Sequence, residues 1–132
     1  MAEDTIHKGP GRVLVAIYGV FALAASARAS VQIATKFGDA PLAYTLSALA
    51  AAVYIVATVA LARGARRVAL AACAFELLGV LAVGTLSVVD GAAFPDATVW
   101  SDYGQGYGYV PLVLPIVGLW WLLRTKAGKP AA

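Results

Sequence analysis

The chain has 132 residues, a formal net charge of +3 and 61% hydrophobic residues. Soluble domains are roughly 45–50% apolar, and a soluble fold of this length could not hide so much apolar surface, because small domains leave a large share of their surface in water. Most of the chain is therefore expected to lie in lipid. The basic residues form no stripe or tail, which argues against nucleic acid as a partner.

Four apolar segments predict four transmembrane helices. Each of the first three has the roughly 20 residues that cross about 30 Å of hydrocarbon, whereas the apolar part of the fourth rises only about 22 Å. The predicted spans are 13–35, 42–62, 68–89 and 107–123, with one long loop at about 90–106. Short connections make consecutive helices neighbours, so we expect an all-α antiparallel up-down-up-down bundle that forms a single transmembrane domain over 1–132.

Charged residues at the segment ends predict the orientation. The basic side carries Lys8, Arg12, Arg63, Arg66, Arg67, Arg124, Lys126 and Lys129. The opposite side carries Lys36 and the acids Asp39, Asp90, Asp96 and Asp102. Segments rich in Lys and Arg stay in the cytoplasm under the positive-inside rule, so both termini are expected to be cytoplasmic.

Two ionisable residues, Arg28 and Glu76, fall inside predicted spans. Charged groups are costly in hydrocarbon, so they face the bundle interior or water and usually have partners. Helical rise places Arg28 in the outer half of the membrane and Glu76 in the inner half, about 10 Å apart in depth. We expect a candidate intramembrane polar site of Arg28, Gln32, Tyr54 and Glu76, joined by a direct ion pair or by a chain of hydroxyls and water.

This polar site has three interpretations. The polar faces expected to meet in the core are Arg28, Gln32 and Thr35 on the first span, Tyr44, Ser47, Ala51, Tyr54 and Thr58 on the second, and Cys73, Glu76, Val80, Val83 and Ser87 on the third. They form a hydrogen-bonded core that fixes helix register, or a proton- or cation-coupled transport site at Glu76. In the third interpretation Arg28 snorkels to the outer interface and Glu76 has no function.

The stretch YGQGYGY at 103–109 lies before the fourth helix. It does not fit a dinucleotide-binding G-x-G-x-x-G loop, because Tyr109 stands where the third glycine is needed, and it lacks the Thr-Val of a potassium filter. We interpret it as a hinge at the outer end of the fourth helix. Its glycines let the backbone turn into the bilayer, and its aromatic side chains form an interfacial belt. The candidate outer-loop contact residues are Trp100, Asp102, Tyr103, Tyr107 and Tyr109.

The sequence gives little support to catalysis or metal binding. Cys73 is the only cysteine and His7 the only histidine, so neither a disulfide nor a zinc or haem site is supported. The sequence has no Ser-x-x-Lys or Gly-x-Ser-x-Gly nucleophile motif, and the outer aspartates lack the spacing of a calcium loop. We therefore expect no catalytic residue, no metal, no cofactor and no enzyme activity.

A family resemblance covers nearly the whole chain, from about Arg12 to Leu123. The chain resembles a family of small, uncharacterised four-helix integral membrane proteins of actinobacteria in the stretches SVQIATKFGDAPLAYTLSALAAAVYIVATVAL, CAFELLGVLAVGTLS and FPDATVWSDYGQGYGYVPLVLP. The resemblance implies a multi-pass protein of the bacterial cell (plasma) membrane and brings no assigned activity. The size also invites comparison with small multidrug transporters, but those place their membrane glutamate in the first helix, so their mechanism is not carried over to Glu76.

These observations lead to three functional hypotheses. The first is an accessory, structural or small oligomeric membrane protein without a catalytic site, whose partners are the lipid bilayer and either a second copy or a larger membrane complex. The alternative is a small oligomeric transporter or channel that uses Glu76 and Arg28. The third is a membrane enzyme that acts on lipid through Asp96 or Asp102.

Overall fold

The computed structural model describes residues 5–90, 92, 98 and 100–125. Four α-helices account for most of them, as the hydropathy predicted: α1 (Pro10–Lys36), α2 (Pro41–Ala62), α3 (Arg66–Val89) and α4 (Val110–Arg124). Three 3-10 segments accompany them: η1 (Thr5–His7), η2 (Phe37–Asp39) and η4 (Ser101–Tyr107). Asp96, Lys126 and Lys129, which contribute to the predicted orientation, lie outside the described residues.

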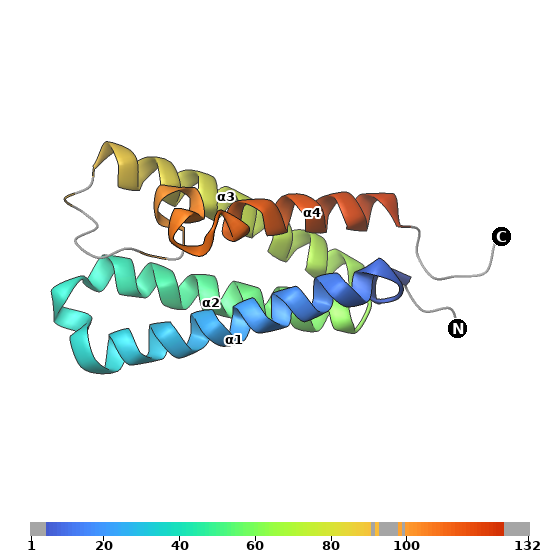
Figure 1. Cartoon of the computed structure of the whole chain (residues 1–132), viewed down its shortest axis with the longest axis horizontal. Coiled ribbons are helices and arrows are strands. Elements are labelled where there is room, and N and C mark those ends of the chain that lie inside the picture. The colour runs from blue at the N-terminus through green and yellow to red at the C-terminus, as the bar shows by residue number, and fades with distance from the viewer. Residues whose placement is uncertain (1–4, 91, 93–97, 99, 126–132) are drawn as a thin grey trace.

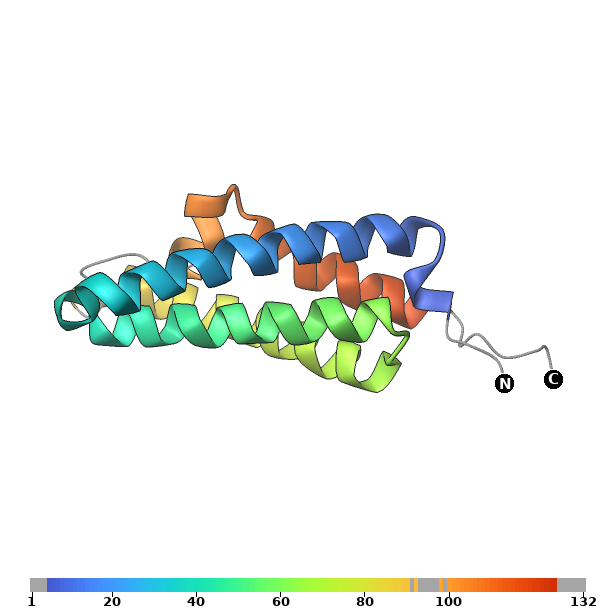
Figure 2. The ribbon, with the colours of Figure 1, turned by 90° about the horizontal axis from the view of Figure 1, so that it is seen from below.

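Each helix packs against the next one in the chain, α1 on α2, α2 on α3 and α3 on α4. Consecutive helices run in opposite directions, and the start of α1 and the end of α4 lie at the same end of the bundle (Figure 1). The view from below shows α1 and α2 side by side along their length (Figure 2). η4 does not extend away from this bundle but packs against α3 and α4.

Three of the helices are long and apolar enough to cross a membrane. α1 has 27 residues, α2 has 22 and α3 has 24, whereas α4 has only 15. α4 begins at Val110 because Gly108 and Tyr109 both have left-handed backbone angles, with φ of 64° and 62°, and such residues do not continue an α-helix. The length of α4 corresponds to a rise of about 22 Å.

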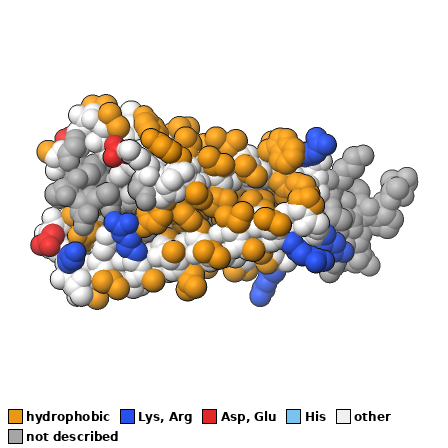
Figure 3. All heavy atoms as spheres, viewed as in Figure 1, with side chains coloured by type: hydrophobic (Ala, Val, Ile, Leu, Met, Phe, Trp, Pro, Cys, Tyr) orange, Lys and Arg blue, Asp and Glu red, His pale blue; other side chains and the backbone are white. Residues whose placement is uncertain are grey.

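The outer surface of the bundle is apolar in its middle. Large aliphatic side chains project outward, including Val20 (70% exposed), Leu23 (74%) and Leu78 (66%). Figure 3 shows hydrophobic side chains over the middle of the molecule, Lys and Arg gathered where α1 begins and α4 ends, and acidic side chains at the opposite end. An apolar belt between two charged ends is the surface that a lipid bilayer covers, so this is a multi-pass membrane protein.

At the basic end, hydrogen bonds join α4 to η1, which precedes α1, and to the start of α3. The Nε1 of Trp121 donates a hydrogen bond of 2.7 Å to the backbone carbonyl of Ile6 in η1, and the guanidinium of Arg66 donates to the carbonyl of Leu122. The neighbouring Trp120 is 55% exposed, and the Arg124 guanidinium lies 5.3 Å from its ring centre. The two tryptophans therefore differ, since one fastens the bundle and the other faces outward.

The core between α1 and α2 consists mainly of small residues. Ala22, Ala25 and Ala29 on α1 are buried, as are Ala43, Ala50 and Ala57 on α2. Alanines let two helix backbones approach closely, and this contact replaces the hydrophobic force that is missing between helices in lipid.

We expect Ala50→Leu to destabilise the bundle by about 1–3 kcal/mol, because Ala50 is fully buried and the added atoms would separate the helices. Chemical unfolding in detergent micelles, followed by circular dichroism, measures this change. The matched control is Ala62→Leu, since Ala62 is exposed on the same helix and should tolerate leucine. Equal stability of the two variants would contradict the close helix contact.

Candidate functional site

Glu76 is the one fully buried ionisable carboxyl among the described residues, with 0% of its surface exposed. It lies about 15 Å along α3, which rises about 36 Å in total. Its helix face is buried throughout, because Ala69, Cys73, Glu76 and Val80 follow each other at alternating spacings of four and three residues. Neither oxygen of the Glu76 carboxyl has a hydrogen-bond partner among the described residues.

Three polar side chains surround this carboxyl. The hydroxyl of Tyr18 on α1 is close enough to Glu76 to interact with it, and Tyr54 on α2 and Cys73 on α3 lie within electrostatic range of the carboxyl. The Tyr18 hydroxyl and the Cys73 sulfur form a hydrogen bond of 3.4 Å in which either group can donate. The rings of Tyr18 and Tyr54 lie 6.4 Å apart between centroids. We call Tyr18, Tyr54, Cys73 and Glu76 the central cluster.

α4 closes the central cluster through Gly118. A Cβ atom at this position would lie 2.8 Å from the Cys73 sulfur and 3.3 Å from the Tyr18 hydroxyl. Such contacts are too close for any larger residue, so the glycine is needed for the approach of α4 rather than for backbone freedom. All four helices therefore contribute to the same buried site.

Trp100 covers the central cluster on the side of η4. Its side chain is only 1% exposed, and its Nε1 donates a hydrogen bond of 3.0 Å to the Tyr54 hydroxyl. The ring occupies the space beside Gly79, where a Cβ atom would come within 2.7 Å of it. Gly79 lies three residues after Glu76 on α3, so the Trp100 ring covers α3 about one helical turn beyond the carboxyl. We call Trp100 the roof of the central cluster.

The segment after Trp100 is fastened to α3. The ring of Tyr103 packs against Gly84, and its hydroxyl shares a hydrogen bond of 2.8 Å with the Thr85 hydroxyl. The backbone N–H of Asp102 donates to the Ser87 hydroxyl over 2.9 Å. Asp102 and Tyr103 hold left-handed φ values of 51° and 60°, which non-glycine residues adopt only where their surroundings enforce them. The YGQGYGY stretch is therefore docked on the bundle.

The predicted outer-loop contact residues fall into two groups. Trp100 is buried, so its expected place in an exposed aromatic belt was wrong, and the reason is the hydrogen bond and packing inside the bundle. Tyr103 and Tyr107 are partly buried, whereas Asp102 and Tyr109 are exposed. Contact of these exposed residues with a partner stays a prediction.

The four residues of the predicted polar site are not all together. Tyr54 and Glu76 share the central cluster, but Arg28 is exposed on α1 and donates a hydrogen bond of 2.8 Å to the Tyr107 hydroxyl. Gln32 is buried on α1, about 21 Å along the helix from Tyr18. The expected inward face of Arg28 and Thr35 was wrong, because α1 turns the face of Tyr18, Ala25 and Gln32 toward the core.

The faces expected on the other two helices are confirmed by their burial. The buried members are Tyr44, Ser47, Ala51 and Tyr54 on α2, and Cys73, Glu76, Val80 and Val83 on α3. Tyr18 was not predicted from the sequence as a neighbour of Glu76. The available signal was its spacing from the alanines of α1, since Tyr18, Ala22, Ala25 and Ala29 repeat at intervals of four and three residues.

The chemistry of the central cluster is that of proton exchange and hydrogen bonding. It offers one carboxyl, one thiol and two phenol hydroxyls. Within the part of the chain that the structure describes, no three His, Cys, Asp or Glu side chains come together to hold a metal ion. The comparison with known proteins found no matching family model, no matching curated protein and no matching solved structure.

We expect the hydrogen bond between Trp100 and Tyr54 to couple the roof to the cluster. Trp100→Phe leaves the Tyr54 hydroxyl without its donor in a dry site, which should cost about 1–3 kcal/mol of unfolding free energy. The combined Trp100→Phe and Tyr54→Phe variant should cost about 1 kcal/mol less than the sum of the single variants. Detergent unfolding of all four proteins measures this coupling.

Trp120→Phe is the control for this cycle, since Trp120 is largely exposed and should show a small change. Strict additivity of the Trp100 and Tyr54 substitutions would contradict the coupling.

Proposed function

We propose that this multi-pass membrane protein is not an enzyme and that it couples the binding and release of a proton at Glu76 to transport across the bilayer. The observation that carries the proposal is the complete burial of Glu76 without a hydrogen-bond partner among the described residues. Ionisable residues inside membrane spans are rare and mark ion pathways and proton relays.

A lone carboxyl in a helix core is costly for the stability of the bundle. A buried charge is costly unless it is paired and hydrogen-bonded, and apolar residues of similar volume fill such positions at equal or better stability. Neither oxygen of Glu76 has a hydrogen bond of ordinary geometry among the described residues, although the Tyr18 hydroxyl lies close to it. A carboxyl that alternates between this buried arrangement and a hydrated one can take up a proton on one side and release it on the other.

The surrounding groups suit such a cycle. The hydroxyls of Tyr18 and Tyr54 and the thiol of Cys73 can each accept and donate a hydrogen bond, so they can pass a proton toward or away from Glu76. The roof of Trp100 lies between this cluster and η4, and its displacement is the step that would hydrate the carboxyl. Arg28 is left out of the proposed site, because its guanidinium is held by Tyr107 at the surface of the bundle.

The proposal includes an orientation and a location. The basic residues at one end of the bundle support cytoplasmic termini in a bacterial plasma membrane. Proton entry past Trp100 would then begin at the extracytoplasmic side, at the end of the bundle that carries Asp39, Asp90 and Asp102.

We expect Glu76→Gln to abolish proton flux in proteoliposomes that carry an imposed pH gradient and an enclosed pH-sensitive dye. The amide has nearly the volume of the carboxyl but cannot exchange a proton at neutral pH, so the variant should fold with undiminished thermal stability. Glu76→Asp should restore part of the flux. The matched control is Arg28→Gln, which should keep the flux of the unchanged protein.

Flux through Glu76→Gln at the level of the unchanged protein would refute the transport role. Loss of flux in both Glu76→Gln and Arg28→Gln would also count against it, since the loss would not be specific to the central cluster.

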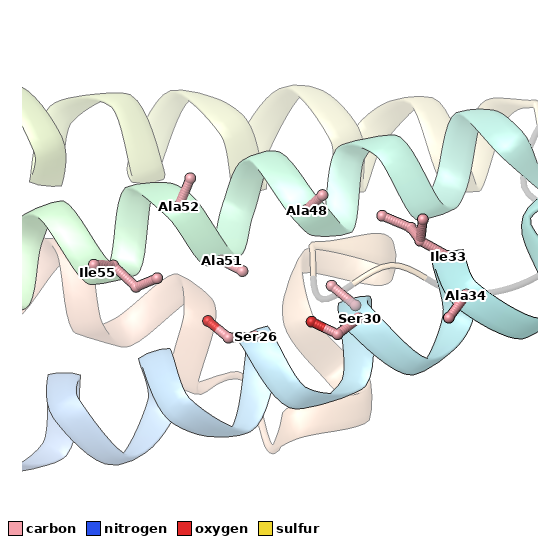
Figure 4. A pocket seen from close by; sticks show the side chains of 9 residues that line it. Ser26, Ser30, Ile33, Ala34, Ala48, Ala51, Ala52 and Ile55 are labelled. Atoms are coloured by element: carbon pink, nitrogen blue, oxygen red, sulfur yellow. The ribbon is translucent and has the colours of Figure 1, made fainter.

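A second candidate function, that of an accessory or small oligomeric protein, is favoured by a groove between α1 and α2. The groove has a volume of about 470 Å³, and the serine side chains of Ser26 and Ser30 line it (Figure 4). Small residues repeat at intervals of four on both walls: Ser26, Ser30 and Ala34 on α1, and Ala48 and Ala52 on α2. The buried Oγ of Ser26 has no hydrogen-bond partner among the described residues.

Such walls accept a transmembrane helix from a neighbouring chain, because small residues permit close backbone approach and serines can hydrogen-bond across the contact. We expect Ala48→Leu to fill the groove and reduce self-association at least several-fold, as measured by crosslinking in native membranes. Ala24→Leu is the control, because Ala24 is exposed on α1 outside the groove. A monomeric unchanged protein without captured partners would contradict this second function.

A further inference from the structure

We propose that α1 carries a binding site for the phosphate of an anionic phospholipid, formed by Arg28 and Lys36 on either side of Gln32. A groove of about 560 Å³ runs along this face and is lined by Ala27, Arg28, Val31, Gln32 and Lys36. The three polar residues are four apart, so they lie in one row on the helix. This site is separate from the central cluster and does not depend on the proposed transport.

Arg28 is held in place by Tyr107, a neutral side chain that does not balance the positive charge of the guanidinium. Its Nη1 donates to the Tyr107 hydroxyl over 2.8 Å, and its guanidinium carbon lies 5.5 Å from the centre of the Tyr107 ring. Tyr107 is itself held against Phe21, with ring centroids 5.3 Å apart. A guanidinium has five N–H donors in a planar fork, so the contact with one hydroxyl leaves most of them for an acceptor such as phosphate.

The groove lacks negative charge of its own. Among the described residues, neither Arg28 nor Lys36 forms an ion pair with a carboxylate, and no acidic side chain lines the groove. Figure 3 shows basic side chains near the end of the bundle opposite the main basic end, with an acidic side chain beside them at the outermost edge. Arg28 and Lys36 lie two helical turns apart on this face, and a phosphodiester between them has the negative charge and the acceptor oxygens to meet both side chains.

Gln32 supplies a further polar group at the centre of the row. Its side chain is 93% buried, at 7% exposure, yet its Oε1 has no hydrogen-bond partner among the described residues. Gln32 also lines the groove, and the N–H₂ group of its amide can donate a hydrogen bond to a phosphate oxygen.

The position along α1 favours a lipid over a free anion. Lys36 ends α1, and Arg28 lies about 12 Å deeper, so the row runs from the membrane surface into the outer part of the hydrocarbon. Phosphate groups of lipids lie at this boundary, where long basic side chains snorkel to meet them. Val20 and Val31 are 70% and 60% exposed on α1 and offer apolar surface to acyl chains.

The test measures lipid binding to the purified full chain in detergent by native mass spectrometry, with phosphatidylglycerol and phosphatidylcholine as the probes. We expect one phosphatidylglycerol to bind about 25-fold more tightly than phosphatidylcholine, because each of the two basic residues contributes about 1 kcal/mol, or about fivefold, toward an anionic lipid. Arg28→Gln and Lys36→Gln should each weaken binding about fivefold, and Arg28→Lys should keep most of it.

Arg124→Gln is the matched control, since Arg124 also lies over an aromatic ring near a helix end but at the opposite end of the bundle. It should leave the phosphatidylglycerol affinity unchanged, and circular dichroism confirms that each variant is folded. Equal binding of the two lipids would overturn the proposal, as would equal losses in Arg28→Gln and Arg124→Gln. Displacement of the lipid by millimolar inorganic phosphate would also overturn it, because the site would then recognise a free anion.

Discussion

The bundle depends on the close approach of large side chains to three glycines. Gly118 on α4 faces Tyr18 and Cys73, Gly79 on α3 faces Trp100, and Gly84 faces the ring of Tyr103. In each contact the neighbour occupies the space that a Cβ atom would need. Helices in lipid associate through this kind of packing, because no hydrophobic force separates them from the acyl chains. The glycines therefore decide which surfaces can meet around Glu76.

The two ionisable groups of the spans are accommodated in opposite ways. Arg28 reaches a hydroxyl and an aromatic face at the surface of the bundle, where its charge is stabilised by Tyr107. Glu76 lies in the interior beside the Tyr18 hydroxyl, and neither of its oxygens has a hydrogen bond of ordinary geometry among the described residues. A bundle built only for stability would more readily contain Arg28 than Glu76, since snorkelling lowers the cost of an arginine near a helix end. This contrast is the reason that function is assigned to the carboxyl.

Much of the fold followed from hydropathy, since the long apolar runs and the small residues specify helices that pack in chain order. Burial of Glu76, Tyr54 and Cys73 also followed from their spacing on α2 and α3. The inward face of α1 was misjudged, because a weakly amphipathic helix of alanines gives no clear signal of which side faces lipid. The docking of Trp100 could not be predicted, because it depends on a contact with Tyr54 that lies 46 residues away in the chain.

That long-range contact has a consequence for the biosynthesis of the protein. α1, α2 and α3 emerge from the ribosome before Trp100, so for a time they lie in the membrane with Glu76 uncovered. Gly118, which closes the opposite side of the carboxyl, follows still later in the chain. A chain interrupted between α3 and η4 would leave its carboxyl open to lipid or to other nascent helices. Addition of Trp100 and α4 to the first three helices is thus the step that covers the Glu76 carboxyl.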